Sequence, residues 1–209
     1  MKDIENSCKI ALVQAEPVLF DKSASLKKAL QWIAEAAAQK PDLIVFPELF
    51  IPGYPVGMNF GFCIGKRSED GRKDWKRYYD ASVVAGETEF QQLAKAAQET
   101  GAYISLGFSE RDAVNGTLYN SNVIFEPDGS YKVHRKLKPT GSERVVWGDA
   151  DKLSFKECVK KDSTLKSKPL HIFRYRQSVY GSFQPIRRQC FLKCFTAGHC
   201  LIFQSVLYR

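Results

Sequence analysis

A carboxylate and an ammonium group each stand at the end of a predicted strand. Glu48 lies just past the apolar run that begins at Leu43, and neither Pro47 nor Pro52 can donate a hydrogen bond to a strand ladder, so the strand ends there. Lys136 closes a second β-rich run further along the chain. Because open α/β sheets build their sites at the carboxyl ends of strands, both side chains suit acid–base or electrostatic work.

Each of these residues also has a structural interpretation. On this segment alone, a loop carboxylate without a catalytic role is an equally good interpretation of Glu48. The basic run formed by His134, Arg135, Lys136 and Lys138 is typical of a solvated sheet edge, where lysines discourage pairing with other chains. The choice between these interpretations depends on the segments that surround them.

The periodicity of the first 151 residues predicts an α/β domain. A strand, a helix and a second strand follow one another at a spacing that suits parallel pairing. The expected elements are strands at 9–14, 42–46, 102–108, 120–126 and 131–136, with a turn at 127–129, and helices that begin at Ser23 or Ser25, at Ser68, and at Thr88 with Gln91 as a capping box, and that end near 39, near 80 and at Gly101.

Several short motifs occur in an order that resembles the nitrilase branch of the carbon–nitrogen hydrolases. The resemblance extends from about Lys9 to about Asp151 and becomes specific because its pieces follow one another in the family's order. They are Phe46-Pro47-Glu48, Gly53-Tyr54-Pro55, Asn59 to Phe62, Gly71 to Tyr79, His134 to Pro139 and Ser142 to Asp149.

This resemblance implies a fold and a set of roles. The fold is an α-β-β-α four-layer sandwich, for which this chain supplies about half of the elements. Glu48 matches the general base, Lys136 the group that stabilises the tetrahedral intermediate, and Glu143 a supporting carboxylate. The implied substrate is a small nitrile or amide, cleaved through a cysteine thioester without cofactor or metal, in a protein that forms homo-oligomers.

The nucleophile that this chemistry needs is missing. The family places a cysteine, followed by Trp-Glu, near the position of Lys166 to Ile172, and no Cys-Trp-Glu occurs in these 209 residues. Cys158 is the nearest thiol, but it comes too early and its lysine-rich surroundings do not read as a buried strand. We therefore expect an inactive chain, or a non-catalytic nitrilase-like module that binds or oligomerises.

The composition changes at the end of the resemblance. Residues 1–151 contain 19 Lys and Arg against 21 Asp and Glu, whereas residues 152–209 contain 12 against 2. This contrast predicts a domain at 1–151 and a basic, poorly ordered tail at 152–209, and it favours a tail read in a different frame from the domain. The alternative is that its basic and aromatic residues bind RNA or a membrane surface.

The remaining composition excludes several classes of protein. No run approaches the roughly 18 apolar residues that a membrane span needs, and no secretory signal pattern opens the chain, so we expect a cytoplasmic protein with free thiols. The near-neutral domain argues against nucleic acid and membrane as partners. Cys190, Cys194, His199 and Cys200 match no zinc-ligand spacing, so no metal is expected.

Overall fold

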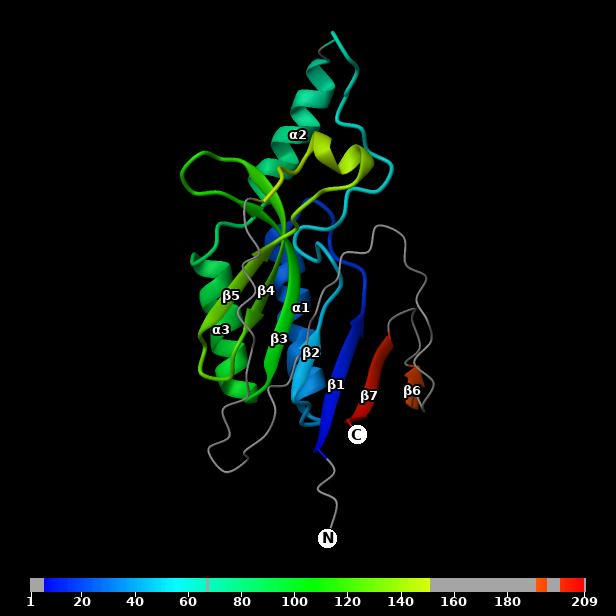
Figure 1. Ribbon diagram of the computed structural model, residues 1–209, viewed down its shortest axis with the longest axis vertical. Helices are drawn as coiled ribbons and strands as arrows, with labels where there is room; N and C mark the ends of the chain where they lie inside the picture. The colour runs from blue at the N-terminus through cyan, green and yellow to red at the C-terminus, as the bar shows by residue number, and fades with distance from the viewer. Residues whose placement is uncertain (1–5, 67, 151–190, 195–199, 209) are drawn as a thin grey trace.

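The computed structural model describes residues 6–66, 68–150, 191–194 and 200–208, which form one mixed sheet with three helices and a short 3₁₀ helix (Figure 1). The strand order is β5-β4-β3-β2-β1-β7-β6. The strands are β1 (Asn6–Gln14), β2 (Leu43–Val45), β3 (Tyr103–Arg111), β4 (Leu118–Phe125), β5 (Tyr131–Arg135), β6 (Phe191–Cys194) and β7 (Cys200–Tyr208). The helices are α1 (Lys22–Ala37), α2 (Glu69–Ala81), α3 (Thr88–Thr100) and η1 (Gly141–Val145).

The β1-α1-β2 unit has the parallel pairing that the sequence predicted, with Ile10 opposite Leu43. The predicted cap of α1 is wrong, because Asp21 caps the helix by accepting a hydrogen bond from the Ala24 amide at 2.8 Å. Ser25 lies inside the first turn, where its hydroxyl bonds the backbone of the preceding loop instead. A serine that satisfies a neighbouring loop cannot also cap its own helix.

The start of α3 also differs from the prediction, while its end agrees. Glu87 is the cap residue and makes no side-chain capping bond, so the capping box expected from Thr88 and Gln91 does not form. Gly101 ends the helix in the left-handed conformation at φ 64°, which glycine adopts without strain. The polar helix α2 follows its Ser68 cap as predicted and lies beyond the upper end of the sheet (Figure 1).

The main core lies between the sheet and the helices α1 and α3, which share one face (Figure 1). Phe90 of α3 is the centre of this layer, with ring centroids 5.3 Å from Phe108 and 5.4 Å from Phe125. The alternation along β3 sends Phe108 into this core and directs Gly107 and Ser109 to the opposite face. The fold is therefore α/β, as expected, and one sheet with one helical layer is half of a four-layer sandwich.

Two segments of the basic tail take part in the sheet, which the sequence analysis did not anticipate. β7 pairs antiparallel with β1 along its whole length, from Asn6 opposite Tyr208 to Gln14 opposite Cys200, and β6 pairs with β7. Without β7, the apolar strand β1 would present a row of unpaired backbone groups at the sheet edge. Residues 151–190 and 195–199 lie outside the described residues, so the division into a domain at 1–151 and a poorly ordered tail stays a prediction.

Phe90→Ala should destabilise the domain by about 3–5 kcal/mol, because it removes a 2 % exposed ring and leaves a cavity among other aromatic rings. Val114→Ala is the control, since that side chain is 95 % exposed and its truncation should change the free energy of unfolding by less than about 0.5 kcal/mol. Urea denaturation followed by tryptophan fluorescence measures both. Equal effects of the two substitutions would contradict this account of the core.

Candidate active site

Glu48 reaches the site because the chain after β2 bulges over Gly107 of β3 before it pairs with β3 again at Ile51. The Phe46 amide donates to the Ser105 carbonyl at 2.8 Å, and the Ile51 amide donates to the Gly107 carbonyl at 3.3 Å. The residues between Phe46 and Ile51 therefore bulge over the glycine. A Cβ at Gly107 would lie 2.5 Å from the Leu49 nitrogen and 2.7 Å from the Glu48 Cα. No side chain fits there, so glycine at this position is a condition for the path of the loop.

The same loop is anchored on its other side by Leu49. This residue has a φ of 52°, which is unusual for leucine, and its side chain is fully buried. It packs in a second cluster with Phe60, Tyr78, Leu118 and Trp147. The strained backbone is held by this packing, and the carboxylate of the preceding residue is turned the other way, toward the site.

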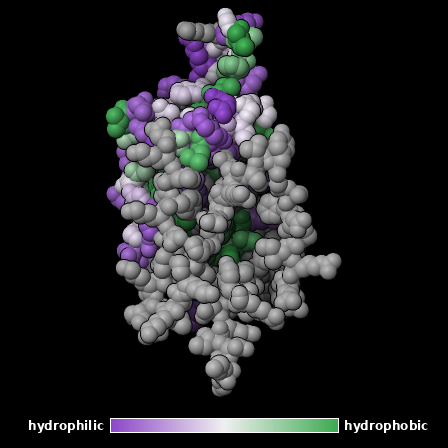
Figure 2. Space-filling model, viewed as in Figure 1, coloured by the Kyte–Doolittle hydropathy of each residue, from purple (hydrophilic) through white to green (hydrophobic). Residues whose placement is uncertain are grey.

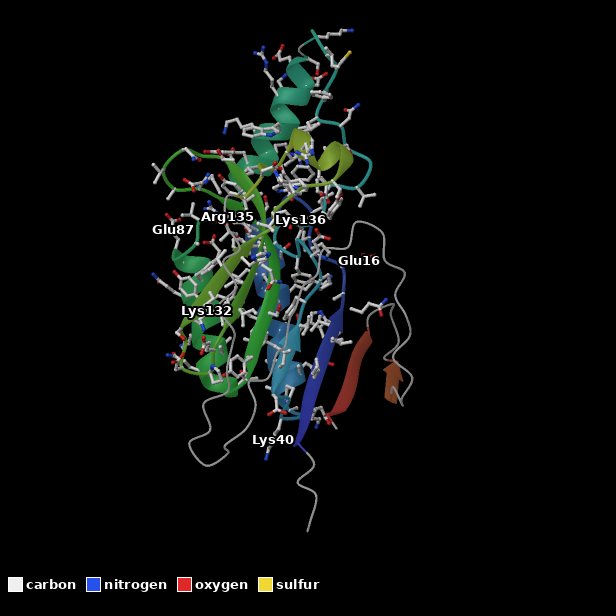
Figure 3. The ribbon with its side chains drawn as sticks, viewed as in Figure 1. Glu16, Lys40, Glu87, Lys132, Arg135 and Lys136 are labelled. Atoms are coloured by element: carbon white, nitrogen blue, oxygen red, sulfur yellow. The ribbon has the colours of Figure 1, made fainter. Side chains whose placement is uncertain are left out.

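Lys136 lies between two carboxylates. Its ammonium Nζ is 3.1 Å from Oε1 of Glu48 and 3.0 Å from each carboxylate oxygen of Glu143. The residue follows β5 directly, at the upper end of that strand in Figure 3, and its backbone amide donates to the Asn120 carbonyl at 2.7 Å. The structure therefore brings together all three site residues that the sequence pointed to.

The route by which they meet differs from the prediction in one respect. Glu48 and Lys136 lie at the carboxyl ends of strands, as predicted, but those strands are not adjacent, because β3 and β4 separate β2 from β5. β2 and β5 run in the same direction, so their carboxyl ends lie at the same end of the sheet. The bulge over Gly107 places the Glu48 backbone above β3, and from there its side chain reaches Asn120 of β4 and Lys136 beyond β5.

Glu143 is held by a capping box. Its Oε2 accepts hydrogen bonds from the Thr140 amide at 2.6 Å and from the Thr140 hydroxyl at 3.1 Å, at the start of η1. Its Oε1 accepts from the Tyr54 hydroxyl at 2.9 Å. Lys136 donates to both oxygens as well. The Glu143 carboxylate is only 8 % exposed, so it holds the Lys136 ammonium in place and does not face solvent.

The charges of the site are set by these contacts. Burial alone raises the pKa of Glu143, but the Thr140 amide, Lys136 and Tyr54 together bring it below its ordinary value. Burial lowers the pKa of Lys136, and the two carboxylates reverse this, so that pKa lies above its ordinary value. Burial and the neighbouring Glu143 raise the pKa of Tyr54. At neutral pH the site therefore holds a carboxylate, an ammonium and a neutral phenol.

Three residues of the site escaped the sequence reasoning as individual side chains. They are Tyr54, Thr140 and Asn120, whose Nδ2 donates to Oε1 of Glu48 at 2.7 Å. Tyr54 belongs to the Gly-Tyr-Pro motif, and Asn120 is the first residue of an Asn-Ser-Asn run that precedes the turn at 127–129. The sequence therefore contained a local signal for each of these two residues. Tyr54 and Asn120 contact carboxylates more than 70 positions away, which local patterns do not contain, whereas Thr140 contacts Glu143 only three positions on.

The basic run around Lys136 is not a uniformly solvated edge. Arg135 forms ion pairs with Glu110 at 2.5 Å and Asp112 at 2.9 Å, and its guanidinium stacks 3.9 Å from the centre of the Tyr119 ring. Glu110 is nearly buried, so this pair fastens β5 to β3 across β4. Lys138 fits the solvated reading better, with an exposed ion pair to Asp149.

No sulfur of a described side chain lies in this site. Cys158 and the window from Lys166 to Ile172 fall outside the described residues, and Cys63 is an exposed free thiol in the loop before α2. Over residues 6–66, 68–150 and the two tail strands, no group of three or more possible metal ligands occurs, and no helix is long and apolar enough to cross a membrane.

Comparison with known proteins identifies the family. The model of the family described as carbon–nitrogen hydrolase matches residues 9–169, which is more than half of the chain. The chain belongs to the carbon–nitrogen hydrolases. The match extends past Asp151, where the recognisable motifs end. Most of the chain thus carries the family pattern, including all three site residues.

The relatives place the chain in the nitrilase branch. An aliphatic nitrilase of Sinorhizobium fredii is 46 % identical over 141 residues, which are 68 % of this chain and 45 % of that protein. Nitrilase 2 of Arabidopsis thaliana is 40 % identical over 141 residues, covering 67 % and 41 %. The chain therefore spans less than half the length of the curated relatives it matches.

Solved structures support the fold. Saccharomyces cerevisiae Nit3, a member of branch 10 of the nitrilase superfamily, matches with a TM-score of 0.55 at 24 % identity, over 70 % of this carbon–nitrogen hydrolase and 49 % of that chain. An N-terminal amidase with a Gln-Gly peptide matches with a TM-score of 0.53 at 21 % identity, over 70 % and 32 %. At these identities the likeness concerns the fold alone.

Gly107→Ala should displace the loop that carries Glu48, because the new methyl group meets backbone atoms of that loop. We expect a loss of about 1–3 kcal/mol in the free energy of unfolding. Gly148→Ala is the control, since the Cβ there first meets a side-chain methyl of Thr117 at 3.0 Å. Denaturant unfolding of both variants measures the difference. A Gly107→Ala protein as stable as the control would show that the bulge over this residue is looser than described.

Acid should weaken the site through Glu143. Because its pKa in the folded protein lies below its ordinary value, its contribution to stability is present above about pH 4.3 and is lost as the pH falls through the lower, folded-state pKa. Glu143→Gln should therefore lower stability at pH 7 and flatten the acid limb of a stability curve measured by urea denaturation between pH 7 and 3. Glu69→Gln, at an exposed carboxylate of α2, should leave that limb unchanged.

Proposed function

We propose that this domain carries the acid–base and electrostatic half of a nitrilase-type site and that this 209-residue chain does not complete the reaction. The observation that carries the proposal is the ammonium of Lys136 between the carboxylates of Glu48 and Glu143. The family and its nitrilase relatives supply the reaction class. The absence of Cys-Trp-Glu from the sequence supplies the second part.

The chemistry follows from the groups present. A nitrile or amide carbon is a poor electrophile, so the reaction is divided into two easier steps by a cysteine that forms a thioester. In that scheme Glu48 takes the proton of the attacking thiol and later of a water molecule. Lys136 stabilises the negative charge that develops on the substrate nitrogen or oxygen. Glu143 holds Lys136 protonated and in place.

Without the thiol, the remaining groups bind and polarise a substrate but have no covalent nucleophile. Direct attack by water, assisted by Glu48, would give only a small residual rate, because removing a nucleophile from such a site removes most of the catalysis. A non-catalytic module that retains the polar pocket is the second function we consider. The intact contacts of Lys136 favour it, since they form without any cysteine nearby in the described part of the chain.

Purified chain should release no ammonia above background from aliphatic or aromatic nitriles. The reason is chemical: no sulfur is available at the position that the family uses. Robust turnover that Cys158→Ala abolishes would overturn this expectation and make Cys158 the nucleophile. Turnover that survives replacement of all six cysteines would point instead to direct attack by water.

We further propose that the chain forms homo-oligomers, as the resemblance implied. Support comes from three strongly exposed apolar side chains of one loop, Val56, Phe62 and Ile64, at 80 %, 61 % and 91 % exposure. Apolar and hydrophilic residues intermingle on the upper end of the molecule (Figure 2). Exposed apolar patches of this kind mark association or aggregation.

Light scattering coupled to gel filtration tests this proposal. The chain should elute as a species larger than a monomer, and replacing Val56, Phe62 and Ile64 by serine should shift it toward the monomer. Val114→Ser, at an isolated apolar residue that is 95 % exposed, is the control and should change nothing. A monomer at all concentrations would contradict the proposal.

A further inference from the structure

Asn120 connects the two sides of the site. It lies on β4 and is 5 % exposed. Its side-chain Nδ2 donates to Oε1 of Glu48 at 2.7 Å, and its backbone carbonyl accepts the Lys136 amide at 2.7 Å. One residue of the central sheet thus contacts both the carboxylate and the strand end that carries the ammonium.

The position of this amide is fixed by its strand. Asn120 is opposite Ser109 in the β3–β4 ladder, and the hydroxyl of Ser109 accepts a hydrogen bond from the buried indole of Trp147 at 3.1 Å. An ionised carboxylate can only accept hydrogen bonds, so the amide must present its NH₂ group to Glu48. A short side chain on a central strand has few rotamers available, so it holds its partner within a narrow range of positions.

The two oxygens of Glu48 have different surroundings. Both hydrogen bonds that Glu48 makes in the described part of the chain end on Oε1, one from Asn120 and one from Lys136. The side chain is nevertheless 50 % exposed, so the carboxylate is open to solvent on its other side. An oxygen that already accepts two strong hydrogen bonds is the poorer proton acceptor of the pair.

We propose that Asn120 is a positioning residue that fixes Oε1 of Glu48 as the anchored oxygen and leaves Oε2 as the atom that takes the proton. This rests on the proposed function, in which Glu48 is the base. The proton passes from the attacking thiol or water to Oε2, and Glu48 becomes a neutral acid. Its Oε1 is then the carbonyl oxygen and keeps the hydrogen bonds from Asn120 and Lys136, so the site need not rearrange between the two protonation states.

The same strand provides a matched control. Asn122 is two residues along β4 and therefore on the same face of the sheet. Its side-chain oxygen accepts a hydrogen bond from the Ser105 hydroxyl at 3.1 Å, in place of the carboxylate contact of Asn120. A substitution at Asn122 thus tests the cost of changing an asparagine on this face, without the contact to Glu48.

The first experiment follows the side-chain amide resonances by ¹⁵N NMR between pH 7 and 3. The pH response of the Asn120 amide should disappear in Glu48→Gln, whereas the response of the Asn122 amide, whose ladder partner is His134, should be the same in both proteins. Persistence of the Asn120 response in Glu48→Gln would overturn the proposal. The other titratable groups around Glu48 are Lys136, Glu143 and Tyr54.

The second experiment replaces the donor by an acceptor. Asn120→Asp sets two carboxylates against each other, so at pH 7.5 the unfolding equilibrium constant should rise about tenfold more than in Asn122→Asp. At pH 5 the difference between the two variants should narrow, because the carboxyl group introduced at position 120 and that of Glu48 can share a proton. Slow exchange of the Lys136 amide in both variants reports that the strands remain paired.

The outcomes separate this proposal from the proposed function. An equal effect of Asn120→Asp and Asn122→Asp at both pH values would overturn the positioning role. If the chain hydrolyses nothing but the Asn120 amide follows the protonation of Glu48, the positioning role stands regardless of turnover. If the chain hydrolyses nitriles and the amide does not respond, Asn120 is only a structural residue.

Discussion

The site depends on one close approach, the passage of the Pro47–Leu49 backbone over Gly107. Backbone atoms of the loop come so near that a single added methyl group would overlap with them. Without this passage Glu48 would remain at the end of β2, with β3 and β4 between it and β5, the strand that Lys136 follows. The packing of the buried Leu49 side chain stabilises the strained backbone conformation that this passage requires.

Around that passage, the site is a balance of buried charge. One ammonium faces two carboxylates, and each carboxylate has additional donors: Asn120 for Glu48, and Tyr54 and Thr140 for Glu143. Burying an unpaired charge is costly, so these donors stabilise the buried carboxylate of Glu143 and the partly buried ammonium of Lys136, while Glu48 stays half exposed. The same arrangement keeps Lys136 protonated and hence able to stabilise negative charge on a substrate.

The predicted helices and strands mostly occur where the residue pattern placed them. Each difference from the prediction has a physical cause in the structure. Ser25 is committed to the loop before α1, so Asp21 caps the helix instead. β7 gives β1 a second partner, although its charge-rich tail had suggested an unstructured segment. The first contact is local, between Ser25 and Val18, whereas the second joins residues 6–14 to residues 200–208, which a local pattern cannot include.

The sequence predicts the α/β class, the family and the three candidate site residues Glu48, Lys136 and Glu143, because periodicity and motif order are properties of the chain. It also determined that Cys-Trp-Glu is missing. The folded structure was needed to show that the chain at Glu48 bulges over Gly107 toward Lys136, that Asn120 lies against one oxygen of Glu48, and that β7 borders β1. These facts depend on strand order and register, which arise when segments far apart in sequence pack together.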